Sequence, residues 1–229
     1  FRAMPARLGT RAGLKWVTSH PETPTRHGLP SVVGLYVLSD AATALPLAIM
    51  DGTSLTALRT GAAAGVASRY LARKGAKPLG LVGAGAQAVQ FLRAHNETFP
   101  GLEVLVADID SERAQGFAAE HHAKLVSTEE AAGCDIVCVA TPSRTPVIHF
   151  DMIKPGAHIN AMGADAPGKQ ELDVEILQSA RVFVDEIEQA RHSGEINVAL
   201  ERGVYSLGDI SGTVGQVIAG RVPPRFDDT

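Results

Sequence analysis

The pattern of hydrophobic and polar positions changes near residue 53, and this change predicts two structural regions. Up to residue 51, short apolar runs alternate with turns and predict strands at 14–17, 32–38 and 47–50. These runs lack the helical spacing of a βαβ unit, so they predict a separate sheet. From Thr53 onward, apolar residues recur at intervals of three and four, which predicts a helix of about 20 residues with Thr53 or Ser54 as its cap.

Strands and helices alternate beyond residue 75, which predicts a doubly wound parallel sheet with helices on both faces. We therefore expect an α/β protein in which a β-rich substrate and dimerisation domain accompanies this sheet. The predicted strands lie at 78–82, 104–107, 136–139, 158–161 and 181–184, and the predicted helices at 111–120, 173–178 and 208–220, with a short helix opened by a capping box at Ser127. The expected domains are 1–60, a linking helix at 54–74, a nucleotide domain at 75–207, and a C-terminal helix at 208–229 that returns to the first domain.

A glycine turn separates the predicted strand at 78–82 from a helix, and its spacing is typical of a Rossmann-like dinucleotide site. Gly83 allows a tight turn, Gly85 lets the backbone approach a pyrophosphate, and the small Ala88 allows close helix packing. The intervening Ala84, and Ala86 and Gln87 at the start of the helix, would place their N–H groups near the pyrophosphate. The alternative is that the glycines only form a tight connection.

Asp108 ends the next apolar run, 25 residues beyond Gly83, which is close to the spacing of about 20 expected of an acid that binds the ribose hydroxyls. A carboxylate there would repel the 2′-phosphate of NADP, so the sequence favours NAD as the cofactor. We expect the neighbouring Ile109 and Arg113 to contact the same half of the cofactor. Arg113 is equally consistent with a solvated charge on a helix.

Two cations in the first region are candidates for substrate binding. Lys15 stands inside an apolar run, where a buried lysine is costly unless it is paired or its pKa is lowered. The alternative is a strand lysine that faces solvent. Arg59 lies among alanines and glycine on the predicted helix and could bind a carboxylate or a phosphate through its guanidinium fork, and we expect Arg59 and the next residue, Thr60, to contact the cofactor as well. The alternative for Arg59 is a salt bridge between helices.

The loop after the predicted strand at 158–161 is the third place where polar residues indicate chemistry. Doubly wound folds bind ligands at the carboxyl ends of their strands. Asp165 is therefore a candidate acid or base, although it could instead cap the next helix. At the same edge we expect contacts to the cofactor from Met162 and Gly163 and from three residues after the strand at 136–139, namely Thr141, Pro142 and Ser143.

Composition excludes several other classes of protein. The 229 residues are 45% hydrophobic and 20% charged, which is enough to bury a core, and the net charge of −4 gives no basic patch for nucleic acid. No apolar run approaches the roughly 18 residues needed to span a membrane, and no signal peptide is evident. Cys134 and Cys138 are typical of small core residues, so we expect a cytoplasmic protein. The histidines show no metal-like spacing.

Six segments, taken in order along the chain, resemble the ornithine cyclodeaminase/μ-crystallin family. Within the family, residues 1–5, 141–144 and 168–173 most resemble its archaeal alanine dehydrogenase branch. The six segments that carry the resemblance are 1–6, 13–17, 50–52, 58–63, 83–88 and 158–165.

The resemblance implies a role for each candidate residue. The lysine matching Lys15 serves the reacting carbon, and the aspartate matching Asp165 handles the amine or the attacking water. The arginines matching Arg2 and Arg59 hold the substrate carboxylate. The family also implies a homodimer, and because its members are longer, we expect parts of the dimerisation domain to lie outside this sequence.

The expected function is that of an NAD-dependent oxidoreductase interconverting L-alanine and pyruvate plus ammonia. One alternative is an ornithine cyclodeaminase, which would form L-proline and ammonia while NAD is reduced and reoxidised within one turnover. The others are a ketimine reductase and a μ-crystallin-like protein that binds NAD(P)H without catalysis. The partners expected are a small amino or keto acid and a second copy of the chain.

Overall fold

The computed structural model describes residues 1–225, and its internal contacts divide the chain into two compact units, 1–59 and from residue 60 onward. One helix, α2 (Gly52–Leu71), is continuous across the boundary. Asp51 caps this helix, since its carboxylate accepts from the N–H groups of Thr53 at 3.0 Å and Ser54 at 2.9 Å. The expectation that Thr53 or Ser54 supplies the cap is therefore wrong, and α2 begins a few residues earlier than predicted.

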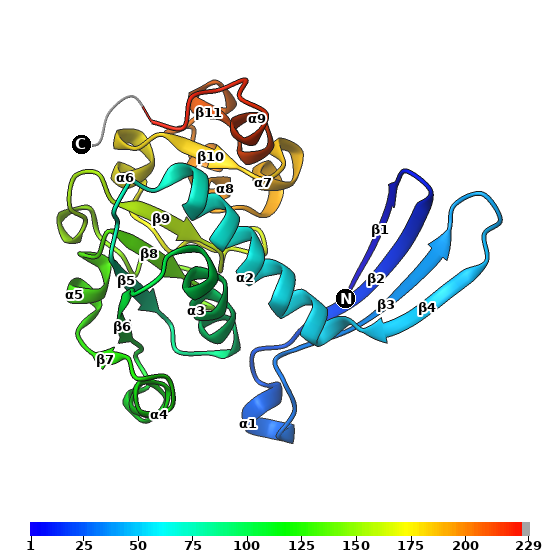
Figure 1. Cartoon of the computed structure of the whole chain (residues 1–229), viewed down its shortest axis with the longest axis horizontal. Helices are drawn as coiled ribbons and strands as arrows, with labels where there is room; N and C mark the ends of the chain where they lie inside the picture. The colour runs from blue at the N-terminus through cyan, green and yellow to red at the C-terminus, as the bar shows by residue number, and fades with distance from the viewer. Residues whose placement is uncertain (226–229) are drawn as a thin grey trace. The chain divides into compact units, whose positions relative to one another are not determined.

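Residues 1–59 form an antiparallel sheet whose strands follow one another in chain order (Figure 1). The three predicted strands are confirmed and extended. A further strand, β1, was missed because residues 2–8 do not alternate apolar and polar side chains and contain two arginines and a proline. The elements are β1 (Arg2–Leu8), β2 (Arg11–Ser19), α1 (Thr23–His27), β3 (Val32–Asp40) and β4 (Pro46–Asp51).

One face of this antiparallel sheet is apolar and exposed. Trp16 pairs with Leu35 across β2 and β3, and Val37 pairs with Ile49 across β3 and β4, which places these side chains on the same face. Trp16 is 48% exposed, Leu35 46% and Ile49 70%. Lys15 alternates with Trp16 along β2 and so belongs to the opposite face.

The second unit contains a five-stranded parallel sheet in the order β7-β6-β5-β8-β9, which confirms the predicted Rossmann-like fold. The chain moves outward in one direction from β5 to β7 and then restarts on the other side of β5 with β8. The carboxyl ends of β5 and β8 therefore lie at the point where the strand order reverses. The strands are β5 (Pro78–Val82), β6 (Glu103–Ala107), β7 (Lys124–Leu125), β8 (Ile136–Val139) and β9 (His158–Ala161).

The helices of this unit largely follow the predicted positions. Ser127 and Glu130 form the predicted capping box at the start of α5, each side chain bonding the other residue's backbone N–H. The helices are α3 (Ala86–Thr98), α4 (Ser111–His121), α5 (Thr128–Ala132), α6 (Val174–Ser179), α7 (Ile187–Ser193), α8 (Asn197–Glu201) and α9 (Val214–Ile218), with single 3₁₀ turns at Phe150–Met152 and Leu207–Asp209.

The C-terminal segment differs from its prediction. The predicted helix at 208–220 is wrong over its first half, because β11 (Ile210–Thr213) pairs in parallel with β10 (Val182–Val184) in a separate two-stranded sheet. Gly212 lies within β11 at a positive φ of 152°, which no helix contains, and the Thr213 side chain caps the short α9. A return of 208–229 to the first domain stays a prediction, and residues 226–229 lie outside the described part.

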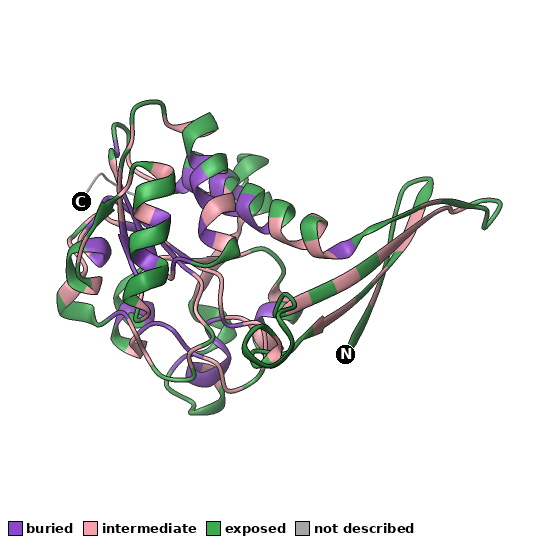
Figure 2. Ribbon diagram, turned by 90° about the horizontal axis from the view of Figure 1, so that it is seen from below, coloured by how far each residue is buried: buried purple, intermediate pink, exposed green. Residues whose placement is uncertain are grey.

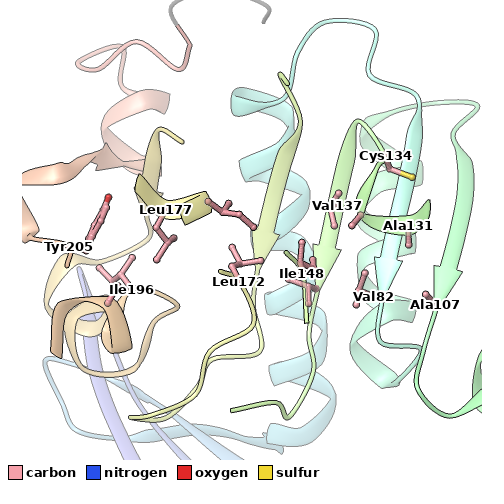
Figure 3. Packing of buried hydrophobic residues seen from close by; sticks show 14 of the residues in the cluster. Val82, Ala107, Ala131, Cys134, Val137, Ile148, Leu172, Leu177, Ile196 and Tyr205 are labelled. Atoms are coloured by element: carbon pink, nitrogen blue, oxygen red, sulfur yellow. The ribbon is translucent and has the colours of Figure 1, made fainter. Parts of the chain in front are cut away.

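The five-stranded sheet separates two hydrophobic layers. Leu81 belongs to the cluster that contains Phe91 of α3. The next residue, Val82, belongs to the other cluster, with Ala131 of α5 and Leu177 of α6, all three labelled in Figure 3. Figure 2 colours the buried segments of this unit purple. Val137 and Cys138 divide between the layers in the same way. Continuous apolar strands are expected of a parallel sheet covered on both faces.

Close backbone packing explains several glycines of this unit. A Cβ on Gly61 would lie 2.5 Å from the carbonyl oxygen of Gln90, and one on Gly65 would lie 2.9 Å from the Cβ of Ala94. Gly61 is thus needed where α2 crosses α3, rather than for ligand binding. A Cβ on Gly80 of β5 would lie 1.9 Å from the carbonyl oxygen of Ala131, so α5 approaches the strand as closely as its backbone allows.

Candidate functional site

The glycine turn after β5 has the geometry that a dinucleotide site needs. Gly83 has φ 97°, and a Cβ there would lie 2.9 Å from the carbonyl oxygen of Ala140, so no other residue fits without strain. A Cβ on Gly85 would meet nothing within 4 Å, which leaves open space where a ligand can approach the backbone. Gly85 gives α3 no side-chain cap, and Ala86 and Gln87 form the first turn of that helix, where the dipole favours an anion. Ala88 is 1% exposed and packs in the core.

Asp108 joins the end of β6 to the glycine turn. One carboxylate oxygen accepts from the N–H of Ala84 at 2.7 Å, and the other accepts from the N–H of Asp110 at 2.9 Å. Each oxygen has a second lone pair, so the carboxylate retains capacity for ribose hydroxyls. The backbone bonds fix the orientation of the carboxylate before any ligand arrives.

Arg113 is placed between two carboxylates beside this turn. Its guanidinium lies 3.8 Å from Asp108 and 3.1 Å from Asp110, and its side chain is 55% exposed. A hollow of about 420 Å³ is lined by these elements, including Gly85, Arg113 and Phe117. The adjacent Ile109 is fully exposed. Arg113 is therefore neither a wholly solvated charge nor a free cation.

The loops after β8 and β9 are brought together by a residue that the sequence did not single out. Glu171 accepts from the backbone N–H of Thr141 at 2.5 Å and from that of Gly163 at 2.7 Å. The three predicted residues 141–143 and the predicted Met162 belong to these loops, and the Ser143 hydroxyl donates to the carbonyl oxygen of Thr145 at 2.6 Å. The sequence signal for Glu171 was its place in the segment 168–173, which carries part of the family resemblance but was given no role in the site.

Asp165 does not cap the next helix, so of its two predicted roles, helix cap and acid or base, the first is excluded. The following helix, α6, begins after Asp173. Asp165 instead forms an ion pair of 2.5 Å with Lys169, whose ammonium also donates to the carbonyl oxygen of Gly163 at 3.2 Å. The side chain of Asp165 is 42% exposed and so remains open to solvent or ligand. Sequence reasoning also missed Lys169.

The first unit brings three predicted cations into electrostatic contact. Lys15 lies on β2 between Met4 of β1 and Tyr36 of β3 and is half-buried. Burial lowers its pKa, and the positive charges of Arg59 and Arg2 lower it further. Such a cluster favours an anion, because a bound carboxylate would relieve the repulsion among the three charges.

The burial of Lys15 and the ion pairs of the described residues bear on the alternatives of a solvent-facing lysine and of a salt bridge between helices at Arg59. Lys15 is half-buried rather than fully exposed, and no ion pair joins Arg59 to a carboxylate within residues 1–225. Thr60, the next residue of α2, is 8% exposed. Its burial makes it a helix-packing residue as well as a candidate for cofactor contact.

The described residues 1–225 offer few other centres of reactivity. In that part of the chain no three histidines, cysteines or acids are grouped for a metal, and no helix is long and apolar enough to cross a membrane. Cys134 and Cys138 are free and buried, and burial raises their thiol pKa values to about 11 and about 12. Both thiols are therefore protonated and unreactive at neutral pH.

Comparison with known proteins gives one family over the whole chain. The model of the ornithine cyclodeaminase/mu-crystallin family matches residues 1–229. An alanine dehydrogenase of Archaeoglobus fulgidus is 48% identical over all of this chain and 72% of its own length. An ornithine cyclodeaminase of Agrobacterium fabrum is 36% identical over 84% of this chain and 57% of its own length. The chain thus spans only part of the relatives that it matches.

A solved structure agrees with this result. An archaeal alanine dehydrogenase dimer with bound NAD superposes with a TM-score of 0.93 at 47% identity, over 99% of this chain and 72% of that one. This similarity extends over both units of the chain.

Proposed function

The chain belongs to the ornithine cyclodeaminase/mu-crystallin family, and from that premise we propose that it is an NAD-dependent oxidoreductase that interconverts L-alanine and pyruvate plus ammonia. The observation that carries the proposal is the cluster of Lys15, Arg2 and Arg59, because three neighbouring cations suit a substrate with a carboxylate. The 48% identity to an alanine dehydrogenase favours alanine as the amino acid.

The residues around the glycine turn fit NAD. Gly83 allows the tight turn, Gly85 leaves room for the pyrophosphate at the start of α3, and Asp108 is held in place to accept from the ribose. When bound, NAD supplies the hydride acceptor for the α-carbon of the amino acid. The solved relative with bound NAD supports this assignment of the cofactor.

The chain's own residues would supply binding and proton transfer. Arg2 and Arg59 hold the substrate carboxylate, and the ammonium of Lys15 donates to the heteroatom at the reacting carbon. Because its neighbours lower its pKa, Lys15 gives up a proton more readily than an isolated lysine. Asp165, held by Lys169, accepts and returns protons as the amine is released. Fixed positions for these groups reduce the entropic part of the barrier.

The assembly that we propose is a homodimer. Trp16, Leu35 and Ile49 are exposed together on one face of the antiparallel sheet. Such a continuous apolar face, unlike single apolar residues scattered over a surface, suits contact with a second copy of the chain. The related alanine dehydrogenase is a dimer. A cytoplasmic location is proposed as well, since both cysteines remain reduced.

Ornithine cyclodeamination is the second candidate, and the family to which the chain belongs supports it. The two reactions differ in net redox change. We expect L-alanine and NAD to give NADH and pyruvate in equal amounts, and L-ornithine to give little proline. Proline from ornithine at catalytic NAD, without NADH from alanine, would replace our proposal with the second candidate. Imine reduction would show as NADH consumption with cyclic imino acids and formation of the corresponding saturated amino acid, with neither NADH from alanine nor proline from ornithine.

A further inference from the structure

The carboxylate of Glu171 is the most completely buried charged group described in the second unit. It is 0% exposed, and it lies on the segment between the loop after β9 and helix α6. One of its oxygens accepts from both the N–H and the hydroxyl of Thr141, at 2.5 and 2.8 Å. The other accepts from the N–H of Gly163 at 2.7 Å. The two oxygens therefore hold two different loops.

The two loops meet so closely that no side chain fits between them. A Cβ on Gly163 would lie 2.5 Å from the carbonyl oxygen of Thr141 and 2.5 Å from the carboxylate of Glu171. Thr141 follows β8, and Gly163 follows β9. The spacing of these two strand ends is thus set at the carboxylate.

The backbone of Glu171 is itself fixed on both sides. Its carbonyl oxygen accepts from the N–H groups of Val147 at 2.8 Å and Ile148 at 3.0 Å. Glu195 accepts from the N–H groups of Glu171 at 2.8 Å and Leu172 at 2.7 Å. The Glu171 side chain therefore projects from a backbone segment that hydrogen bonds hold on both sides, and its carboxylate fixes the positions of both loops relative to that segment.

Burying a charged carboxylate only to connect two loops costs free energy that a neutral side chain would not. Burial raises the pKa of Glu171, and only the three donated hydrogen bonds and the nearby ammonium of Lys169 offset that cost. A glutamine has one acceptor oxygen, so it could accept from the backbone N–H of Thr141 or from that of Gly163 but not from both. Only an acceptor with two oxygens serves donors on two loops.

We propose that Glu171 is a positioning residue that sets the spacing of the two loops facing the nicotinamide half of the nucleotide site. The inference rests on the proposed function. In a doubly wound sheet the dinucleotide crosses the point where the strand order reverses. Asp108 follows β6 and marks the adenosine half, so the loops after β8 and β9 lie at the other half.

The test compares two ligands that share the adenosine half. NAD and ADP-ribose are titrated calorimetrically into the parent protein and into Glu171→Gln. We expect a roughly tenfold loss of NAD affinity, as for a lost hydrogen bond to a charged group, and less than about a twofold change for ADP-ribose. Glu186→Gln is the matched control, because Glu186 also accepts from a backbone N–H but caps α7. It should change neither affinity.

The possible outcomes separate the inference from its premise. Equal losses for both ligands, or no loss for either, would overturn the role of Glu171. A parent protein that binds neither ligand would instead overturn the proposed function. Should Glu171→Gln fail to fold, Thr141→Val and Thr141→Ser provide the test, since valine lacks the hydroxyl that donates to Glu171 and serine keeps it. Valine should weaken NAD alone, and equal affinities for the two variants would contradict the proposal.

Discussion

From residue 60 onward, the predicted acid Asp108 is held by backbone N–H groups that donate to its carboxylate. In residues 1–59, by contrast, the predicted site residues are three cations that repel one another. Asp108 is fixed by the N–H groups of Ala84 and Asp110. Lys15 is flanked by two arginines that lower its pKa. The nucleotide site is therefore complete without its ligand, while the cationic cluster gains stability from an anion.

This difference predicts where substitutions act. A change in the cationic cluster removes a group whose function depends on the substrate, so it should reduce turnover and leave the cofactor site intact. A change at the glycine turn should reduce cofactor affinity. A change in the layered core around the parallel sheet should reduce stability before it affects either.

Lys15→Ala is expected to have the largest effect. Loss of a positioned proton donor typically reduces turnover by a factor of about 100 or more, so steady-state rates with alanine and NAD should fall by at least that much. NAD affinity should stay within about twofold of the parent value, because Lys15 belongs to residues 1–59.

Arg11→Ala is the matched control for Lys15, since Arg11 lies on the same strand, is itself exposed, and pairs with Asp40 at 3.2 Å. Its rate should be close to that of the parent. If Lys15→Ala kept roughly a tenth of the activity or more, Lys15 would be an ordinary strand residue. The prediction that the cationic cluster acts on turnover would then be wrong.

Asp108→Ala is the second test, and it acts on the other unit. A charge-assisted hydrogen bond to the ribose contributes about 1.5–3 kcal/mol, so NAD affinity should fall by roughly 10- to 150-fold. NADP affinity should fall less, because the repulsion of the 2′-phosphate is removed at the same time. Calorimetric titration of both cofactors measures the two changes.

Asp110→Asn controls for the charge near Asp108. Asparagine still caps α4, while the ion pair of 3.1 Å with Arg113 is lost. We expect little change in NAD affinity. Equal NAD affinity in Asp108→Ala and the parent would show that the carboxylate only orders the turn.

The sequence predicted the second unit better than the first, for a physical reason. Strands buried on both faces give continuous apolar runs, and the turn at Gly83 requires a backbone that other residues avoid. β1 has neither signal, because its residues Arg2–Leu8 are mostly exposed and include two arginines and a proline. Glu171 was missed because its partner Thr141 lies 30 residues away on a loop that only the folded chain brings near. Lys169 was missed although its partner Asp165 is only four residues away, because an irregular loop gives no periodic spacing that predicts such a pair.

Gly80→Ala tests the packed core of the second unit. The added Cβ would lie 1.9 Å from the carbonyl oxygen of Ala131, so α5 must move, and we expect a destabilisation of about 1–3 kcal/mol. Gly116→Ala is the matched control: it adds the same atom to the interior of α4 with nothing within 4 Å and should stabilise by about 0.5–1 kcal/mol. Urea denaturation measures both, and changes of the same sign would contradict the packing argument.

Glu195→Gln tests whether the second unit also controls the dependence of stability on pH. Glu195 is 9% exposed, and burial raises its pKa from 4.5 to about 8, with the neighbouring Glu171 raising it further. A raised carboxyl pKa means that the folded state holds a proton that the unfolded state releases. The stabilising contribution is thus full below pH 4.5 and is lost as the pH rises through about 8, by at most about 1.4 kcal/mol per pH unit. Glutamine keeps the oxygen that accepts from Glu171 and Leu172 but does not titrate. The free energy of unfolding of the variant, measured in urea from pH 5 to 8, should therefore decline less than that of the parent, and parallel curves would show that Glu195 is already ionised in the folded protein.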